Sequence, residues 1–144
     1  MLDMFFFAKD FNQPINDWDT SNVTNMSYMF YEARSFNQPI DSWDISKVTE
    51  MSYMFAKTLE FNQNISSWNL ENIINCDYIF KDAESFLDKY NSGEPLPNRI
   101  EKIKEWFNLN RDKMDAIDIK EEYGEEINNF FNKLQTNSIQ KKEI

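Results

Sequence analysis

Apolar and polar positions recur along most of this chain with a period of 25 residues. The segment Phe11-Asn-Gln-Pro-Ile15 returns as Phe36-Asn-Gln-Pro-Ile40 and again as Phe61-Asn-Gln-Asn-Ile65, with no insertion between the copies. Constant spacing is expected where each coil of a repeat protein stacks equivalent residues on those of the next coil. The pattern therefore predicts a stack of 25-residue coils over residues 1–90.

Three full repeats and one partial repeat follow from this period. The first two full repeats match at 15 of 25 positions and the second and third at 8 of 25, so the pattern weakens toward the C-terminus. The predicted units are a partial coil at 1–10 and full coils at 11–35, 36–60 and 61–85.

The positions within one repeat predict short strands and a short helix. Met26, Met29, Phe30 and Ala33 have the i, i+3, i+4, i+7 spacing of one helix face. Proline in the Phe-Asn-Gln-Pro-Ile segment favours an extended chain before it, and Val23 begins a second short extended run. We therefore expect an α/β repeat solenoid, leucine-rich-repeat-like, followed by C-terminal α-helices.

Large aromatic residues should form columns that run from coil to coil. Burial is the expected state of the tryptophans, because large aromatic side chains normally pack in a core. An exposed aromatic stripe that binds a partner is the alternative. The columns comprise Phe11, Phe36 and Phe61; Trp18, Trp43 and Trp68; and Phe30, Phe55 and Phe80.

Asparagine recurs at one position of the repeat, as Asn12, Asn37 and Asn62. Asparagines that lie in register can bond to the backbone of a neighbouring coil. We interpret them as an internal hydrogen-bond ladder and not as a ligand site.

The repeat pattern ends near Tyr90, and a different composition follows. Residues 91–97 contain a glycine and two prolines and are predicted to be a linker. Residues 98–144 are predicted to be helical, with one helix to about Asn110 and a second over 121–135 whose apolar stripe is Ile127, Phe130, Phe131 and Leu134. These helices either cover the end of the stack or form a separate partner-binding module.

Composition excludes several classes of function. The formal net charge is −10, which disfavours nucleic acid and anionic membrane surfaces. No segment approaches the length of a membrane span, so no membrane insertion is expected. The acidic excess lies mainly in the repeats: residues 1–85 carry 13 acidic and 5 basic side chains, a net of −8.

Candidate chemistry is sparse, so no catalytic, cofactor or metal residue is predicted. The chain has no histidine, which removes the commonest general base and most zinc sites. Cys76 lies in the column of Met26 and Met51 and is interpreted as a buried apolar residue. Asp19 and Asp44 recur as Asn69 and are interpreted as turn residues in preference to calcium ligands.

The motif Trp-Asp-x-Ser-x-Val-Thr-x-Met-Ser-x-Met-Phe, with the following Phe-Asn-Gln-x-Ile, resembles a known bacterial repeat. It spans Trp18–Phe30 with Phe36–Ile40, and Trp43–Phe55 with Phe61–Ile65. It is similar to the repeat of about 25 residues in surface lipoproteins of mycoplasma-type bacteria, and to the BspA-like leucine-rich repeat. The resemblance implies a solenoid displayed outside the cell and associated with adhesion. It supplies no catalytic residues.

Two features at the start of the chain bear on location. No export signal is recognisable there, so a cytoplasmic protein or a fragment of a surface protein is an alternative to the surface location. Met1-x-x-Met-Phe-x-x-Ala8 aligns with Met26-x-x-Met-Phe-x-x-Ala33, so the chain opens within a coil. The uncapped N-terminal end could pair with another chain.

The expected function is non-enzymatic binding, of protein or glycan, at a bacterial cell surface. A stack of coils offers a continuous face on which weak contacts can add. The alternative is a structural or variable surface repeat, or a truncated gene remnant, without a dedicated ligand.

Overall fold

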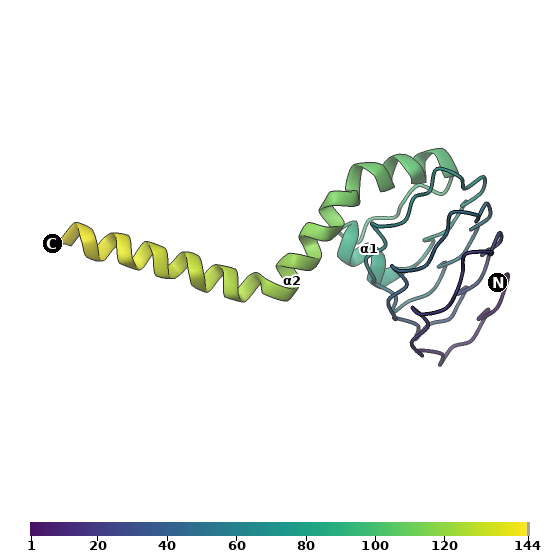
Figure 1. Ribbon diagram of the computed structural model, residues 1–144, viewed down its shortest axis with the longest axis horizontal. Helices are drawn as coiled ribbons and strands as arrows, with labels where there is room; N and C mark the ends of the chain where they lie inside the picture. Colours follow the sequence, from purple (N-terminus) through teal and green to yellow (C-terminus); the bar gives the residue numbers. More distant parts are fainter. Residues whose placement is uncertain (144) are drawn as a thin grey trace.

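The computed structural model describes the backbone of residues 1–143 and most of their side chains; the side chains of residue 127 and residues 135–143, and Ile144, lie outside the described part. Two helices are present in that part, α1 (Glu84–Tyr90) and α2 (Ile100–Glu143). Residues 1–83 form successive coils that lie side by side, and α2 crosses one end of this stack before it runs away from it (Figure 1).

Backbone hydrogen bonds join each coil to the next in a regular order. In residues 26–33 the even-numbered N–H groups donate to the following coil: Met26 to Glu50 O at 2.8 Å, Tyr28 to Ser52 O at 2.9 Å and Phe30 to Met54 O at 3.0 Å. The same bonds recur 25 residues later. In this segment, half of the backbone N–H groups of each coil therefore donate to the next coil. These bonds satisfy buried backbone groups without a β-sheet.

The predicted α/β solenoid with short strands and a short helix in each coil is wrong. The residues that the structure describes contain no strand beyond the isolated parallel bridges Asn25↔Glu50 and Glu50↔Asn75. No helix occurs before Glu84. The coils consist of turns joined by single bridges, so the leucine-rich-repeat architecture does not describe them.

Consecutive tight turns explain why the helical spacing misleads. Met29 N–H bonds Met26 O and Ala33 N–H bonds Phe30 O, so two four-residue turns follow one another directly. Each turn buries its first and last residue, which yields the same i, i+3, i+4, i+7 pattern as a helix face. A helix is excluded because Tyr28 and Glu32 have positive φ values of 58° and 55°.

These left-handed residues recur at the same two positions of each coil, and none of them is glycine. Left-handed backbone costs an L-residue roughly 1–2 kcal/mol. Ring stacking offsets part of this cost in the tyrosine column, where Tyr28 and Tyr53 centroids lie 4.9 Å apart and Tyr53 and Tyr78 centroids 5.1 Å apart. The residues concerned are Asp3, Phe7, Tyr28, Glu32, Tyr53, Lys57, Tyr78 and Asp82.

The core of the stack is built from parallel aromatic rings. Phe30 and Phe55 stack at 5.7 Å with an interplanar angle of 8°, and Phe55 and Phe80 at 5.8 Å with 4°. A second column interleaves with the first, since Phe36 lies 4.1 Å from Phe30 and 5.9 Å from Phe61. Burying such rings is the main stabilising term for a fold with so little regular secondary structure.

The helix α2 is continuous, whereas the sequence predicts two helices, one that ends near Asn110 and one over 121–135. Its first part covers the last coil with the buried side chains Ile103, Trp106, Phe107 and Met114. Arg111 donates to Ser66 O and to Trp68 O, which fixes the helix on the third coil.

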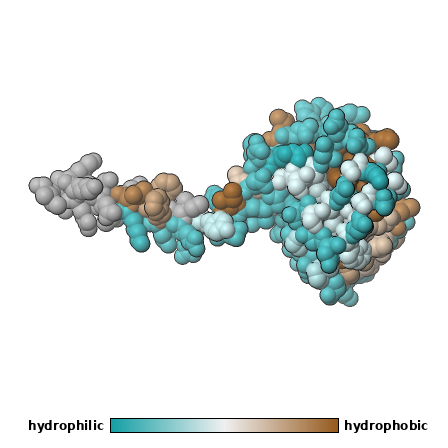
Figure 2. Space-filling view, in the orientation of Figure 1, coloured by the Kyte–Doolittle hydropathy of each residue, from teal (hydrophilic) through white to brown (hydrophobic). Residues whose placement is uncertain are grey.

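The rest of α2 projects from the body, and apolar side chains lie along it (Figure 2). Of the predicted stripe, Phe130, Phe131 and Leu134 are exposed. Ile127 lies outside the described side chains.

Candidate binding site

The tryptophan column differs between its members. Trp43 and Trp68 are buried, with indole N–H groups that donate to Ile15 O at 2.9 Å and Ile40 O at 3.2 Å. Trp18 is 39% exposed, and no described residue accepts from its indole. Two of the three tryptophans therefore belong to the core and bind the preceding coil.

The phenylalanine columns are likewise brought together in the interior. Phe11 is half-buried and stacks on Phe36 at 5.8 Å, and Phe36 stacks on Phe61. Phe30 and Phe55 are completely buried, so these two rings are not available to a ligand. Phe80 is 3% exposed and borders the pocket described below.

The asparagines at the repeated position also lie in register. The side-chain oxygen of Asn12 accepts from Asn37 N–H at 2.8 Å, and that of Asn37 accepts from Asn62 N–H at 3.0 Å. The glutamine directly after the second asparagine of each pair donates to the same oxygen: Gln63 Nε2 donates to Asn37 Oδ1 at 2.9 Å. These side chains are used for contacts between coils.

The aspartates tested as calcium ligands form turns. The carboxylate of Asp19 accepts from both the hydroxyl and the N–H of Ser21, which lowers the pKa of Asp19. Ser46 lowers the pKa of Asp44 in the same way. Among the described residues no group of three or more acidic or cysteine side chains could hold a metal ion.

Cys76 is buried in the core, and burial raises the pKa of its thiol to about 12. A thiol with this pKa is almost entirely protonated at neutral pH, whereas the nucleophile of a cysteine enzyme is the thiolate. Its environment is that of a packing residue.

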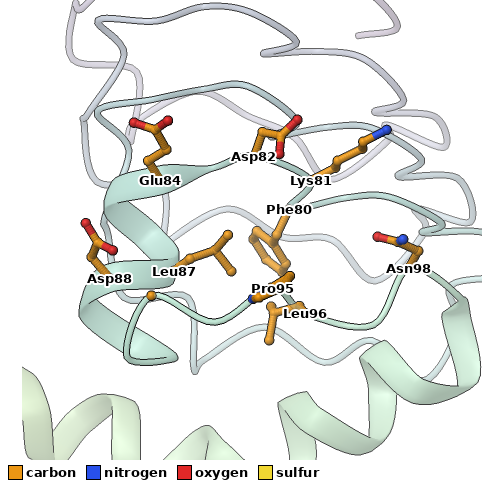
Figure 3. Close-up of a pocket in the computed structure, with 10 residues that line it drawn as sticks. Phe80, Lys81, Asp82, Glu84, Leu87, Asp88, Pro95, Leu96 and Asn98 are labelled. Atoms are coloured by element: carbon orange, nitrogen blue, oxygen red, sulfur yellow. The ribbon is translucent and has the colours of Figure 1, made fainter.

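A pocket of about 450 Å³ lies where the last coil, α1 and the linker meet (Figure 3). The side chains of Phe80 and Leu87 point toward each other across it, and Leu96 and Pro95 from the linker complete an apolar floor. The rim carries the carboxylates of Asp82, Glu84 and Asp88 and the amine of Lys81. We call this site the last-coil pocket.

Two backbone donors border this pocket without an acceptor. In the coils before it, the equivalent N–H groups donate onward, as Phe55 does to Ile79 O at 2.9 Å and Lys57 to Lys81 O at 2.8 Å. In the last coil Tyr78 N–H finds Asn98 O in the linker, but Phe80 and Asp82 N–H have no partner among the described residues.

The last-coil pocket therefore presents two backbone donors that are unpaired in the described part of the chain, two residues apart, beside an apolar floor. Carbonyls at that spacing point to the same side of an extended strand. Sequence reasoning missed this site, although one signal was available: the repeat fails after Phe86, so the donors of the last coil lose their usual acceptors there.

Among the described residues, no helix is long and apolar enough to cross a membrane. Pairing through the N-terminal end stays a prediction; Leu2, Met4, Phe6 and Phe7 are exposed there.

Comparison with known proteins supplies a family but no activity. No curated protein and no solved structure matches the chain. A family model described as "Mycoplasma protein of unknown function, DUF285" matches residues 1–94, the whole of the stacked coils together with α1. The mycoplasma part of the resemblance is thereby confirmed, whereas the BspA-like relationship is not. The chain belongs to the Mycoplasma DUF285 family.

Proposed function

We propose that this protein is a non-enzymatic binding module of the bacterial cell surface, and that its ligand is an extended segment of another protein. The observation that carries this proposal is the pair of free donors, Phe80 and Asp82 N–H, beside an apolar floor. A strand that adds its backbone to such an edge gains main-chain hydrogen bonds and can place alternate side chains in a pocket.

The charge around the last-coil pocket indicates which kind of peptide segment it would bind. The rim has three carboxylates and one amine, and the chain as a whole is strongly acidic. A segment with lysine or arginine beside an apolar residue fits both the rim and the floor made by Phe80, Leu87 and Leu96. The surface location rests on the family and its resemblance to mycoplasma surface proteins.

The test uses the full chain and an array of extended peptides in which lysine alternates with apolar residues, beside copies with glutamate for lysine. The basic peptides should bind, and amide signals of Phe80 and Asp82 should shift on titration in NMR spectra. The amides of Phe30 and Glu32 already have acceptors and should stay unchanged.

A matched pair of variants checks the role of the rim. Asp82→Asn, Glu84→Gln and Asp88→Asn together should weaken peptide binding about tenfold at low salt. The same chemical changes at exposed acids far along the chain, Asp10→Asn, Asp17→Asn and Glu60→Gln, should leave affinity almost unchanged.

A structural or variable surface repeat without a dedicated ligand is the competing function. Absence of binding on peptide and glycan arrays would favour it, because the family match itself gives no ligand. Binding to glycans alone would keep the binding class but overturn the peptide ligand.

A further inference from the structure

The projecting part of α2 carries an apolar stripe within residues 119–134, and no other part of the described chain covers it. Ile119, Tyr123, Phe130 and Leu134 are between 45% and 60% exposed. At about 100° per residue these four side chains fall within one narrow face of the helix. Phe131, also exposed, lies at its edge.

An exposed helix whose apolar stripe is unpacked is not expected to be stable by itself. Isolated helices in water are marginal, and most helical stability in proteins comes from packing of an apolar face. Ile119, Tyr123, Phe130 and Leu134 are separated by four, seven and four residues, so they recur on one face of the helix.

Charge along the same segment identifies the occupant. Of the five acidic side chains at 118–126, Asp118 and Glu121 pair with Lys89 of the same chain, and Glu122, Glu125 and Glu126 do not. Residues 128–134 carry one basic side chain, Lys133, and no acidic one. Two copies in antiparallel orientation place the acidic part of each against the basic part of the other. In a parallel pair, the acidic parts would lie side by side and repel.

We propose that α2 is a self-association element, and that two copies of this chain pair through their projecting helices in antiparallel orientation. Glu126 and Lys133 flank the stripe on the same side, and antiparallel pairing about a two-fold axis near residues 129–130 brings Glu126 of one copy beside Lys133 of its partner. Phe130 lies close to this axis and packs on the partner stripe.

The expected strength follows from the area available. Five half-exposed apolar side chains supply on the order of 500 Å² per copy, or about 1,000 Å² per pair, which is the lower limit for a specific interface. A dimer with micromolar affinity is therefore expected. The face is too acidic for an anionic membrane surface, where amphipathic helices usually carry lysine and arginine.

Sedimentation equilibrium of the full chain tests the proposal. The wild type should shift from monomer to dimer as its concentration rises through the micromolar range, and its helical circular dichroism signal should increase in parallel. Phe130→Gln with Leu134→Gln should weaken dimerisation at least about tenfold. The matched control, Asn128→Gln with Asn129→Gln, lies off the stripe and should dimerise like the wild type.

Charge exchange tests the orientation. Glu126→Lys or Lys133→Glu alone should weaken the dimer about tenfold, because each creates two like-charge contacts. The double exchange should restore affinity, since the pair re-forms with reversed sign. Failure of that restoration would overturn the antiparallel arrangement.

Two outcomes would overturn self-association altogether. One is a monomer at every concentration with tryptophan fluorescence showing intact coils. The other is a monomer that instead binds vesicles containing anionic lipid, which would identify the stripe as a membrane-binding face.

Discussion

The stacked coils and the projecting part of α2 contain the same kinds of side chain in opposite environments. Phe30, Phe55 and Phe61 are completely buried, whereas Phe130 and Phe131 are more than half exposed. The difference is one of neighbours, because a coil has an equivalent coil beside it to supply a matching ring. The projecting helix has no such neighbour within the described chain, so its apolar stripe stays exposed there.

The largest effect that can break this comparison is removal of a core ring. Phe55→Ala should lower the free energy of unfolding of the coils by about 3–5 kcal/mol, because it removes a ring that touches both neighbouring coils. Phe130→Ala should leave coil stability almost unchanged. Urea unfolding followed by tryptophan fluorescence compares the two, and equal losses would contradict the division into regions.

The tryptophan column provides a smaller contrast within the coils. Trp68→Phe should cost about 2–3 kcal/mol, because it leaves a buried carbonyl, Ile40 O, without its donor and opens space in the core. Trp18→Phe has no bond of this kind to lose and should cost well under about 1 kcal/mol. If Trp18→Phe lowers the free energy of unfolding as much as Trp68→Phe does, the position of a tryptophan in the column does not determine its contribution to stability.

At the junction between α1 and α2, the comparison can be tested through the pH dependence of stability. Burial raises the pKa of Tyr90, and its hydrogen bond to Asp118 at 2.7 Å raises it further. The fold thus favours the protonated phenol, so this stability is complete below the unfolded tyrosine pKa near 10 and is lost as pH rises above it.

Tyr90→Phe should therefore lower stability by about 1 kcal/mol at neutral pH and make the alkaline decline shallower. The decline should not vanish. Burial lowers the pKa of Lys89, but its bonds to Glu121 and Asp118 outweigh this and raise it, so Lys89 also loses its contribution as pH rises. Denaturant unfolding between about pH 8 and pH 11 measures the contributions of Tyr90 and Lys89 to stability. If stability declines with pH as steeply in Tyr90→Phe as in the wild type, Tyr90 does not contribute to the decline.

The smallest expected effect concerns the asparagine ladder. Asn37→Ala should cost about 1 kcal/mol, because the Asn37 side chain accepts from Asn62 N–H and from Gln63. Asn62→Ala should cost less, since no described residue donates to the Asn62 side chain. Thermal unfolding of the two variants provides the comparison, and reversed order would show that the ladder does not stabilise the coils.

The helical spacing of Met26, Met29, Phe30 and Ala33 shows how far periodicity can be trusted. It correctly indicates which side chains are buried. It does not distinguish a helix from two successive turns, since both bury residues at the same spacing. In this coil the left-handed residues that decide between them are Tyr28 and Glu32, and neither residue type has a local preference for positive φ.

Sequence reasoning missed the last-coil pocket for a related reason. Its floor combines Phe80 from the repeat, Leu87 from α1 and Leu96 from the linker, three segments with different patterns. Its free donors exist because the linker supplies one acceptor, Asn98 O, where a full coil would supply several.

The sequence by itself determined the 25-residue register and the membership of each aromatic column, because an indel-free repeat requires equivalent residues to meet. Only the tertiary structure decided the backbone between those columns. A donor that bonds the next coil cannot also bond its own helix, and that choice depends on a neighbour 25 residues away, which local preference does not encode.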